Sequence, residues 1–581
     1  MKGKKLISSL LVFCLLCTMS LCGVAYAEDG AAYQAGEYTA EAAGRNGSFP
    51  VSVEVTDSSI ISVVIGENAE TPSLGGVAVK QIPQRILEEQ STAVDAVSGA
   101  TITSEAIITA VEECLVQAGA ELEQIRKPVE VKEETIEDAT CDIVVIGGGI
   151  AGLTAAWVAS EQGKNVILVE KASVLGGNAL VADGNISGAG TKIQKEAGIE
   201  DSVDQWLADT VNPDSAYTVD DPVFTRLLYE GSTEAVDILS ERGVEFVFTP
   251  EYPRGHVVGP EAYASCYKMV DAIVSWGEAN GVDFRKNTTA EHLIAEDGVI
   301  KGVQVVHNNA SYNIYADAVI LATGGYCNNK ELVAKYNPEY VNVPPRVNPG
   351  ATGDGIIMAE EVGAGLRAME AGIHASSKSV VTDADICFQI IYNPCIVVNQ
   401  EGNRFFAEDI NYGPAGTAIA KQTGSKAYMI FDQASIDNDA ILQDYLASGV
   451  FAEASSAEEL AELIGTPALP DTLTAYNEMA ASGVDTEFGR ETYIQPITGE
   501  KLYAMEVVPY IYYSYGGVLI DTNANVLTAD GDVIPGLYAC GETIGSPQAW
   551  EGFVYECGLG NGLTFGRIAA LSASDYVSSN S

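Results

Sequence analysis

The chain has 581 residues and a formal net charge of −49, with 80 acidic and 31 basic side chains. This length is enough for several domains with sizeable cores. The acidic charge argues against nucleic acid and anionic lipid as partners, and it fits a protein that works outside the cytoplasm.

The N-terminus has the pattern of a secretory signal peptide. Lysines at positions 2, 4 and 5 precede an apolar run over 6–22, and Ala25-Tyr26-Ala27 follows. We therefore expect residues 1–27 to be removed and the protein to be exported, as a secreted, cell-surface or periplasmic protein. The eight cysteines that follow this segment and the four histidines are scattered without C-x-x-C pairs, so we expect no disulfide framework, no metal site and no c-type haem.

Residues 33–120 are predicted to form a small α+β unit. Strands are expected at 36–39, 49–55 and 60–65, and helices at 79–89 and 104–115. The following stretch, 121–139, is charged and interrupted by Pro128, which is typical of a linker.

The segment from Thr140 has the pattern of a dinucleotide-binding turn. An apolar strand, 142–146, leads into Gly147, Gly149 and Gly152, and a helix is expected over 153–162. The first glycine permits the tight turn, the second lets the backbone approach a pyrophosphate, and the third lets the helix lie close to the sheet. A second strand, 165–169, ends at Glu170, the acidic residue expected at a ribose hydroxyl.

Further glycine turns lie far along the chain. A strand at 316–322 runs into Thr323-Gly-Gly, and a turn at 351–355 opens a helix at 356–362. Strands are expected at 517–521 and 536–542, and a last helix at 563–572. Turns of this kind near both ends indicate a nucleotide-binding domain, 140–369 and 512–581, that is split by an inserted segment, 370–511.

Taken together, these motifs resemble those of the FAD-dependent flavoproteins of the fumarate reductase, flavocytochrome c and succinate dehydrogenase superfamily. The resemblance rests on GGGIAG (147–152), Glu170-Lys171, GGN (176–178), ATGG (322–325), ATGDG (351–355), G-x-R-F (402–405) with Glu408, and GLYACGE (536–542). It implies an α/β fold in which a Rossmann-like FAD-binding domain is split by an inserted α+β capping domain. The residues that it places at FAD are Gly147, Gly149, Ala151, Gly152, Glu170, Lys171, Gly177, Asn178, Gly184, Asp354, Tyr513 and Glu542. Members that bond FAD covalently use a histidine just after G-G-N, and 179–190 contains none, so the resemblance implies non-covalent FAD.

The N-terminal unit resembles the FMN-binding domains of bacterial electron-transfer proteins. Its signature is Asp95-Ala-Val-Ser-Gly-Ala-Thr101, the sequence at which a flavin transferase esterifies the phosphate of FMN to threonine. The resemblance implies covalent FMN at Thr101, which would relay electrons from a membrane-associated or extracellular donor. The alternative is that residues 98–104 are only a helix-capping turn.

The presumed substrate pocket departs from that of fumarate reductases. In fumarate reductases the acid is an arginine a few residues after G-x-R-F-x-x-E, and Tyr412 stands at that position here. Tyr512 and Tyr513 stand where fumarate reductases have paired histidines. The late arginine that binds substrate is missing near Tyr555. Without cationic partners, burying two carboxylates would cost several kcal/mol, so we do not expect fumarate as substrate. The tyrosines are similar to those of 3-ketosteroid dehydrogenases and related enone reductases.

The resemblance assigns Tyr412 as proton donor and Tyr555 or Tyr513 as polariser of a substrate carbonyl, while Arg404 orients the loop. A neutral phenol can donate without adding charge. Since the chain has 27 tyrosines, the alternative is that these rings only pack.

The sequence thus favours an exported reductase of the activated C=C bond of a small α,β-unsaturated carbonyl compound, acting as an anaerobic electron sink. One alternative is a ketosteroid-type dehydrogenase that runs the reverse desaturation. Another is a non-catalytic flavin electron carrier. Direct use of NAD(P)H has no support, because we find no second dinucleotide turn.

Overall fold

The computed structural model of the protein describes residues 33–70, 75–97, 100–127, 135–182, 184–210, 222–248, 255–257, 262–380, 385–546 and 557–580. These residues form two compact units, one over 33–96 and 100–127 and the other over 135–580. The predicted signal peptide, 1–27, lies outside the described residues. In the part of the chain that is described, no helix combines the length and the apolar character that a membrane span requires.

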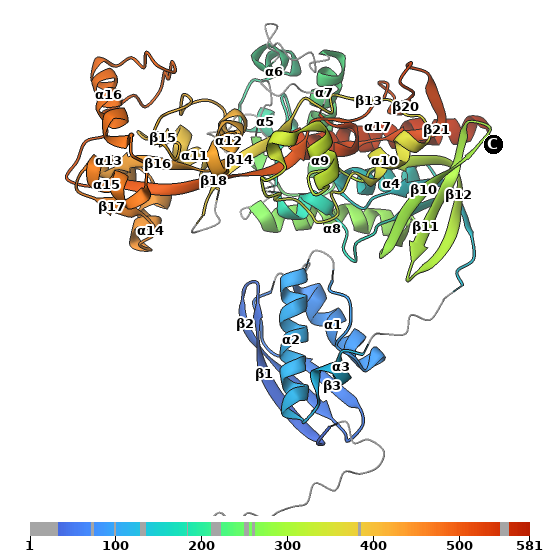
Figure 1. Ribbon diagram of the computed structural model, residues 1–581. Helices are drawn as coiled ribbons and strands as arrows, with labels where there is room; N and C mark the ends of the chain where they lie inside the picture. The colour runs from blue at the N-terminus through green and yellow to red at the C-terminus, as the bar shows by residue number, and fades with distance from the viewer. Residues whose placement is uncertain are drawn as a thin grey trace, which may run out of the picture. The chain divides into compact units, whose positions relative to one another are not determined.

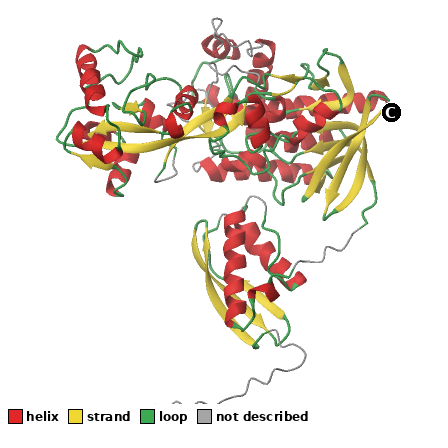
Figure 2. Cartoon of the chain, in the orientation of Figure 1, coloured by secondary structure: helices red, strands yellow, loops and turns green. Residues whose placement is uncertain are grey.

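The N-terminal unit is an antiparallel sheet with helices packed against it (Figures 1 and 2). Its strands β1 (Gly36–Gly44), β2 (Gly47–Val55) and β3 (Ile60–Ile65) pair in that order. Alternate residues of β2, Phe49, Val51 and Val53, are at most 1% exposed. They form the core with helices α1 (Gly75–Glu89) and α2 (Thr101–Gln117).

Helix α2 begins three residues before the predicted start at 104. The amide of Ser104 donates to the carbonyl of Ala100 over 2.9 Å, which is the first hydrogen bond of the helix. Thr103 is buried and donates to Glu70 at 2.8 Å, so this turn is fixed by contacts that lie 33 residues away in the sequence. Thr101 is therefore the first helical residue.

Part of the predicted linker, 121–139, is folded. Helix α3 (Leu122–Ile125) lies there, and Ile125 is 1% exposed. Next to it, the Arg126 guanidinium donates to both oxygens of Glu112 at 2.7 and 2.6 Å. One of the charged residues that indicated a linker, Arg126, therefore forms an ion pair with α2.

An eight-stranded mixed sheet forms the centre of the large unit. Its strand order is β10-β11-β12-β4-β5-β9, with β21 on β12 and β20 on β21. Its strands are β4 (Ala139–Ile146), β5 (Val166–Val169), β9 (Asp283–Arg285), β10 (Thr288–Glu296), β11 (Val299–His307), β12 (Ala310–Leu321), β20 (Asn525–Leu527) and β21 (Val533–Ala539). Ile146 pairs in parallel with Leu321, and Leu321 with Ala539, so the turns after β4, β12 and β21 lie at one edge of the sheet.

Two helices from opposite ends of the unit pack closely. In α4 (Ile150–Glu161) every residue from Ile150 to Ser160 is buried. The last helix, α17 (Cys557–Asn580), is much longer than the predicted 563–572. Its Gly562 faces the Ile150 side chain and its Gly566 faces the Ala151 carbonyl, so closely that a side chain at either position would overlap α4. These two glycines are thus packing positions in the helix.

The predicted strand over 517–521 is shorter in the structure. Only β19 (Gly517–Val518) forms, paired with β13 (Leu366–Arg367). The Asp521 carboxylate accepts the amides of Asn523 and Asn525, which makes a turn where the strand was expected to continue.

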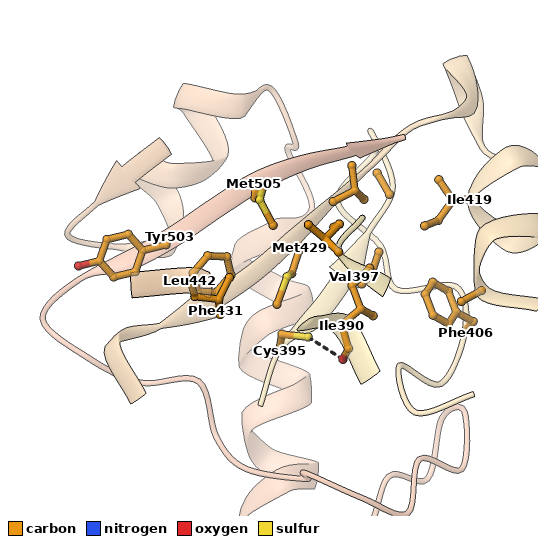
Figure 3. Packing of buried hydrophobic residues seen from close by; sticks show 14 of the residues in the cluster. Ile390, Cys395, Val397, Phe406, Ile419, Met429, Phe431, Leu442, Tyr503 and Met505 are labelled. Carbon is orange, nitrogen blue, oxygen red and sulfur yellow. Dashed lines mark hydrogen bonds between the residues drawn. The ribbon is translucent and has the colours of Figure 1, made fainter. Parts of the chain in front are cut away.

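A second sheet is built mainly by the predicted insert. It contains β14 (Ile373–Ser379), β15 (Ile396–Val398), β16 (Ala427–Asp432), β17 (Ala452–Ala454) and β18 (Leu502–Ser514). Alternate residues enter separate cores: Met429 and Phe431 of β16 belong to one, and Ile430 to the other. The first core also includes Leu442 and Tyr503 (Figure 3). Both faces of this sheet are therefore covered.

Helices of this part are α11 (Cys387–Ile391), α12 (Tyr412–Ala420), α13 (Gln433–Asn438), α14 (Ala440–Ala447), α15 (Ala457–Ile464) and α16 (Leu469–Ser482). Other elements of the large unit are η1 (Gly177–Val181), β6 (Asn185–Ser187), α5 (Lys192–Glu196), α6 (Val203–Thr210), α7 (Pro222–Glu241), β7 (Val247–Phe248), β8 (Gly255–Val257), α8 (Ala262–Ala279), α9 (Lys330–Tyr336), η2 (Pro338–Tyr340), α10 (Asp354–Glu361), η3 (Thr423–Ser425) and η4 (Gly541–Ile544).

Candidate active site

The glycine turn after β4 has the geometry expected of a dinucleotide site. Gly147 has φ +106°, which favours glycine, and any side chain there would meet the Ala322 carbonyl. A side chain at Gly152 would overlap the Gly147 carbonyl, so this position holds α4 against the turn. At Gly149 a Cβ would meet nothing within 4 Å, and the residue precedes α4 with no side-chain cap on the helix. The first amides of α4 are thus available to a phosphate.

Glu170 closes the turn after β5. Its two carboxylate oxygens accept the amides of Gly148 and Ala172, each at 2.7 Å. Burial raises the pKa of Glu170, and the hydrogen bonds from Ala172 and Gly148 oppose that rise. The predicted acidic residue is therefore attached to the glycine turn itself.

Lys171 connects the turn after β5 to α10. Its ammonium donates to Asp354 at 2.7 Å and to Thr352 at 2.6 Å. Both Lys171 and Asp354 were predicted to be cofactor residues, and the structure pairs them across 183 residues of sequence.

Glu542 is the carboxylate at the centre of the site. It accepts the amide of Ser514 at 2.9 Å and the side-chain amide of Asn178 at 3.1 Å. The other end of the Asn178 amide accepts the backbone N–H of Asn348 at 2.8 Å. Burial raises the pKa of Glu542 to about 7, against the opposing effect of its hydrogen bonds with Ser514 and Asn178.

These residues line one cavity of about 710 Å³, a volume within the usual range for ligand sites of about 300–1,000 Å³. The predicted residues on its wall are Gly147, Gly149, Ala151, Glu170, Lys171, Gly177, Asn178, Gly184, Asp354, Tyr412, Tyr513 and Glu542. Gly152 is absent from the wall because it faces the Gly147 carbonyl. An open glycine backbone, an uncapped helix start and a carboxylate at the end of β5 are the groups that fit a dinucleotide such as FAD.

Aromatic and polar side chains from the capping part and from the segments next to it gather on the same cavity. Tyr510, Tyr512, Phe388, Cys387, Asp385 and Arg346 line it beside Tyr412 and Tyr513. Tyr510 donates to the Asp385 carboxylate, and Ser376 donates to the same oxygen at 3.1 Å. Burial, and then the Asp385 charge, raise the pKa of Tyr510 far above its usual range.

The position of Tyr412 suits a proton donor. It is the first residue of α12, whose cap is Asn411, and it is 9% exposed. Burial raises the pKa of Tyr512 well above its usual range, and its hydrogen bond with Tyr412 raises it further. Tyr412 and Tyr512 are therefore neighbours on the wall of the cavity.

Tyr513 is held by α17. The side-chain amide of Asn561 donates to the Tyr513 hydroxyl at 2.9 Å and to the Gly545 carbonyl at 3.0 Å. The hydroxyl itself is 3.5 Å from the Gly545 carbonyl, which is long for a hydrogen bond of its kind.

A β-bulge explains why two consecutive tyrosines reach the cavity. His374 pairs with Tyr513 and Ala375 with Ile511, so Tyr512 is an extra residue on β18. Neighbouring residues of a regular strand point to opposite faces, and a bulge redirects one of them.

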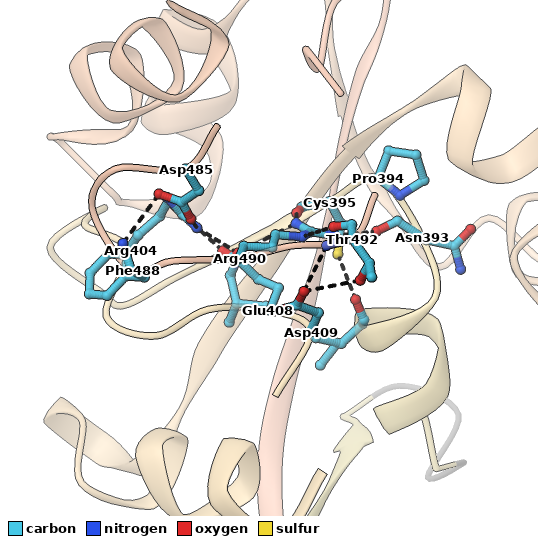
Figure 4. Close-up of polar contacts among 12 residues, drawn as sticks. Asn393, Pro394, Cys395, Arg404, Glu408, Asp409, Asp485, Phe488, Arg490 and Thr492 are labelled. Carbon is cyan, nitrogen blue, oxygen red and sulfur yellow. Dashed lines mark hydrogen bonds and ion pairs between the residues drawn. The ribbon is translucent and has the colours of Figure 1, made fainter. Parts of the chain in front are cut away.

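Arg404 lies away from the cavity wall, inside the capping part (Figure 4). Its guanidinium donates to Glu408 at 2.9 and 2.7 Å and to Asp485 at 2.7 Å, and all three side chains are 0% exposed. Its contacts hold together the start and end of the segment 404–408, which precedes Tyr412 in the chain.

The remaining predicted residues are placed as follows. Thr101 is exposed at the start of α2 in the N-terminal unit, while Ser98 and Gly99 of its motif lie outside the described residues. Tyr555 also lies outside them. Sequence reasoning missed Asp385, Tyr510, Phe388, Arg346 and Asn561. Tyr510 could have been found, because it lies two residues before Tyr512 on one strand.

Comparisons with known proteins agree with this arrangement. The FAD binding domain family matches residues 142–552, and the FMN-binding domain family matches residues 44–116. A fumarate reductase (cytochrome) of Shewanella frigidimarina is 34% identical over 450 residues, which cover 76% of this chain and 78% of that protein. A urocanate reductase of Eggerthella lenta is 30% identical over 564 residues, 92% of each chain.

Among solved structures, the 3-ketosteroid-delta4-(5alpha)-dehydrogenase of Rhodococcus jostii RHA1, in complex with 4-androstene-3,17-dione, superposes with a TM-score of 0.63. It is 26% identical and covers 76% of this chain and 98% of its own. The resemblance and the fold class expected from the sequence are confirmed.

Proposed function

Because the chain belongs to the FAD binding domain family and carries an FMN-binding domain before it, we propose that it reduces the activated C=C bond of an α,β-unsaturated carbonyl compound other than fumarate. Its relatives include reductases named for fumarate and for urocanate. The observation that carries the proposal is that four tyrosines, Tyr412, Tyr510, Tyr512 and Tyr513, line the same cavity as the dinucleotide turn.

Reduced FAD bound in this cavity would supply the hydride. The chain itself must protonate the α-carbon and stabilise charge on the carbonyl. Tyr412 gives the proton, and the phenolate that remains is stabilised by the N-terminus of α12. Tyr513, oriented by Asn561, donates to the carbonyl oxygen. Tyr555 remains a second candidate for that role.

The charges on the wall favour a neutral or monoanionic substrate. Of the lining residues that the structure describes, Lys171 and Arg346 are the cationic ones, and Lys171 is paired with Asp354. A dicarboxylate would leave one carboxylate without a cationic partner, at a cost of several kcal/mol.

In this proposal, electrons enter the protein through an FMN that is attached to Thr101. Its hydroxyl is exposed at the start of α2, where an esterified phosphate would lie beside the first amides of the helix. A flavin transferase would attach FMN there after export, and a membrane-associated or extracellular donor would reduce it. The anchored flavin cannot be lost outside the cell.

The experiment is oxidation of reduced methyl viologen by the purified full chain with a panel of unsaturated acids and ketones. Tyr412→Phe should lower kcat about 100-fold or more with normal FAD content. Tyr428→Phe is the matched control, because Tyr428 is a buried tyrosine on β16 that does not line the cavity. Full turnover by Tyr412→Phe would refute the proton-donor role.

The structural neighbour favours one alternative, a dehydrogenase that desaturates a saturated ketone. Turnover of saturated ketones with an artificial electron acceptor, together with no reduction of any enoate or enone, would support it. If two flavins redox-cycle but no substrate reoxidises them, the protein is an electron carrier.

A further inference from the structure

Four aromatic rings form a row from the cavity to the surface of the large unit. The ring centroids are 6.0 Å apart between Tyr412 and Phe388, 6.1 Å between Phe388 and Tyr392, and 6.4 Å between Tyr392 and Tyr493. The exposed fraction is 9% for Tyr412, 37% for Phe388, 44% for Tyr392 and 41% for Tyr493. We call these four side chains the aromatic row.

Core packing accounts for only one end of the row. Tyr412 is buried against Cys387 and Ile391, whereas the other three rings are left partly in solvent. Single exposed aromatic residues are ordinary, but three adjacent ones that continue a cavity wall are typical of a ligand site. Phe388 connects the cavity to the exposed rings, because it both lines the cavity and stacks on Tyr392.

The outer end of the row is maintained against backbone strain. Tyr493 has φ +52°, in the left-handed region that is unfavourable for a bulky residue. The residues before it are fixed: Asp409 accepts the amides of Glu491 and Thr492 at 2.8 Å, and Arg490 donates to the Thr492 carbonyl at 2.7 Å (Figure 4). Strain that neighbouring contacts impose is found most often where a side chain has a function.

We propose that the aromatic row binds an aryl group on the β-carbon of the substrate, so that the substrate class is an aryl-substituted acrylate. The inference rests on the proposed function. Rings at 4.5–7 Å prefer offset or edge-to-face partners, which a planar aryl group supplies and an alkyl chain does not. With the aryl group on Phe388, the double bond lies beside Tyr412, and Arg346 on the cavity wall provides positive charge for one carboxylate.

Binding can be measured without turnover, from the change in FAD absorbance when ligand is added to the oxidised full chain with both flavins. The probes are trans-cinnamate and crotonate, which differ only in phenyl against methyl on the β-carbon. We expect cinnamate to bind at least about 10-fold more tightly. Phe388→Leu should weaken cinnamate binding about 10-fold and crotonate binding less than about 2-fold. Tyr315→Leu, at a tyrosine on β12 that is 39% exposed, should change neither.

Tyr493→Gly separates a binding role from a structural one. Glycine relieves the positive φ, so the melting temperature should stay or rise while the affinity for cinnamate falls. A loss of melting temperature with unchanged affinity would show that Tyr493 only packs.

The inference would be overturned if cinnamate and crotonate bind with equal affinity. It would also be overturned if Phe388→Leu weakens the binding of both probes equally, or if a steroid enone binds more tightly than cinnamate. If cinnamate binds through Phe388 but is not reduced, the reductase function fails and the subsite stands. If crotonate is reduced and cinnamate does not bind, the subsite fails and the reductase function stands.

Discussion

Replacing Arg404 by methionine should destabilise the capping part strongly. The guanidinium makes three charge-assisted hydrogen bonds of 2.7–2.9 Å to Glu408 and Asp485, and none of the three side chains is exposed to solvent. Removing it leaves two carboxylates buried. Breaking a buried ion pair in this way costs about 3–5 kcal/mol.

The structure favours the lower end of that range. Arg490 remains 3.4 Å from Glu408, and the amide of Val397 still donates to Glu408 at 3.1 Å. We therefore expect a loss of about 3 kcal/mol, which corresponds to about 100-fold faster amide exchange in β15 and β16. Global unfolding of a chain with several domains is not two-state, so hydrogen exchange of these strands is the appropriate assay.

The pH dependence supplies a second check. Burial alone would raise the pKa of Asp485, but the hydrogen bond with Arg404 and those from the amides of Glu487 and Phe488 lower it to about 2. A carboxyl with a lowered pKa stabilises the fold above its unfolded pKa, near 4, and this contribution is lost as the pH falls toward 2. The difference in unfolding free energy between wild type and Arg404→Met should thus be constant from pH 7 to about 4, and it should become smaller below pH 4.

A matched control is Arg226→Met, because Arg226 pairs with Asp204 and Glu230 at the surface and is 46% exposed. It should change stability by less than about 1 kcal/mol. If amide exchange shows that Arg404→Met also destabilises β15 and β16 by less than about 1 kcal/mol, the contacts of Arg404 with Glu408 and Asp485 do not stabilise the capping part, and the reasoning is wrong.

Three further outcomes follow from the sites. Thr101→Ala should abolish covalent FMN and leave FAD bound, as read from the mass of the intact chain. The control Thr103→Ala should retain FMN. Covalent FMN on the Thr101→Ala chain would disprove Thr101 as the attachment site. Gly152→Ala should lose FAD because its side chain overlaps the Gly147 carbonyl, while Gly149→Ala should fold normally and bind FAD more weakly, both read from flavin absorbance. In FAD-free protein, Glu542 with a pKa of about 7 should make stability fall by up to about 3 kcal/mol as the pH rises from about 4.5 to 7. Glu542→Gln should remove that slope, as measured by amide hydrogen exchange in β18 and β21 after correction for the intrinsic pH dependence of exchange.

The predictable part of the site was local in sequence. The strand, glycine turn, helix and acid of residues 142–170 follow from hydrophobic pattern and backbone geometry within one βαβ unit, and the structure has them in place. The positions at Lys171, Asp354 and Glu542 came from family motifs rather than from physical reasoning. Lys171 contacts Asp354, and Glu542 lies on the wall of the same cavity, so these segments meet at one edge of the sheet.

The unpredicted part depends on contacts between distant residues. Tyr510 meets Asp385 across 125 residues, and Arg404 meets Asp485 across 81. No periodicity indicates such partners. The bulge that directs both Tyr512 and Tyr513 to the cavity depends on pairing with β14, and the start of α17 depends on packing against α4. Tertiary contacts outweighed local propensity at both places.

The length of β18 has a mechanical consequence. One strand of 13 residues begins at Leu502 in a core of the capping part and ends at Ser514, whose amide and hydroxyl bond Glu542 at 2.9 and 3.1 Å. At about 3.3 Å per residue it extends roughly 40 Å. One continuous strand therefore joins a core of the capping part to a carboxylate on the wall of the cavity, so the same element serves both the fold of the insert and the predicted FAD site.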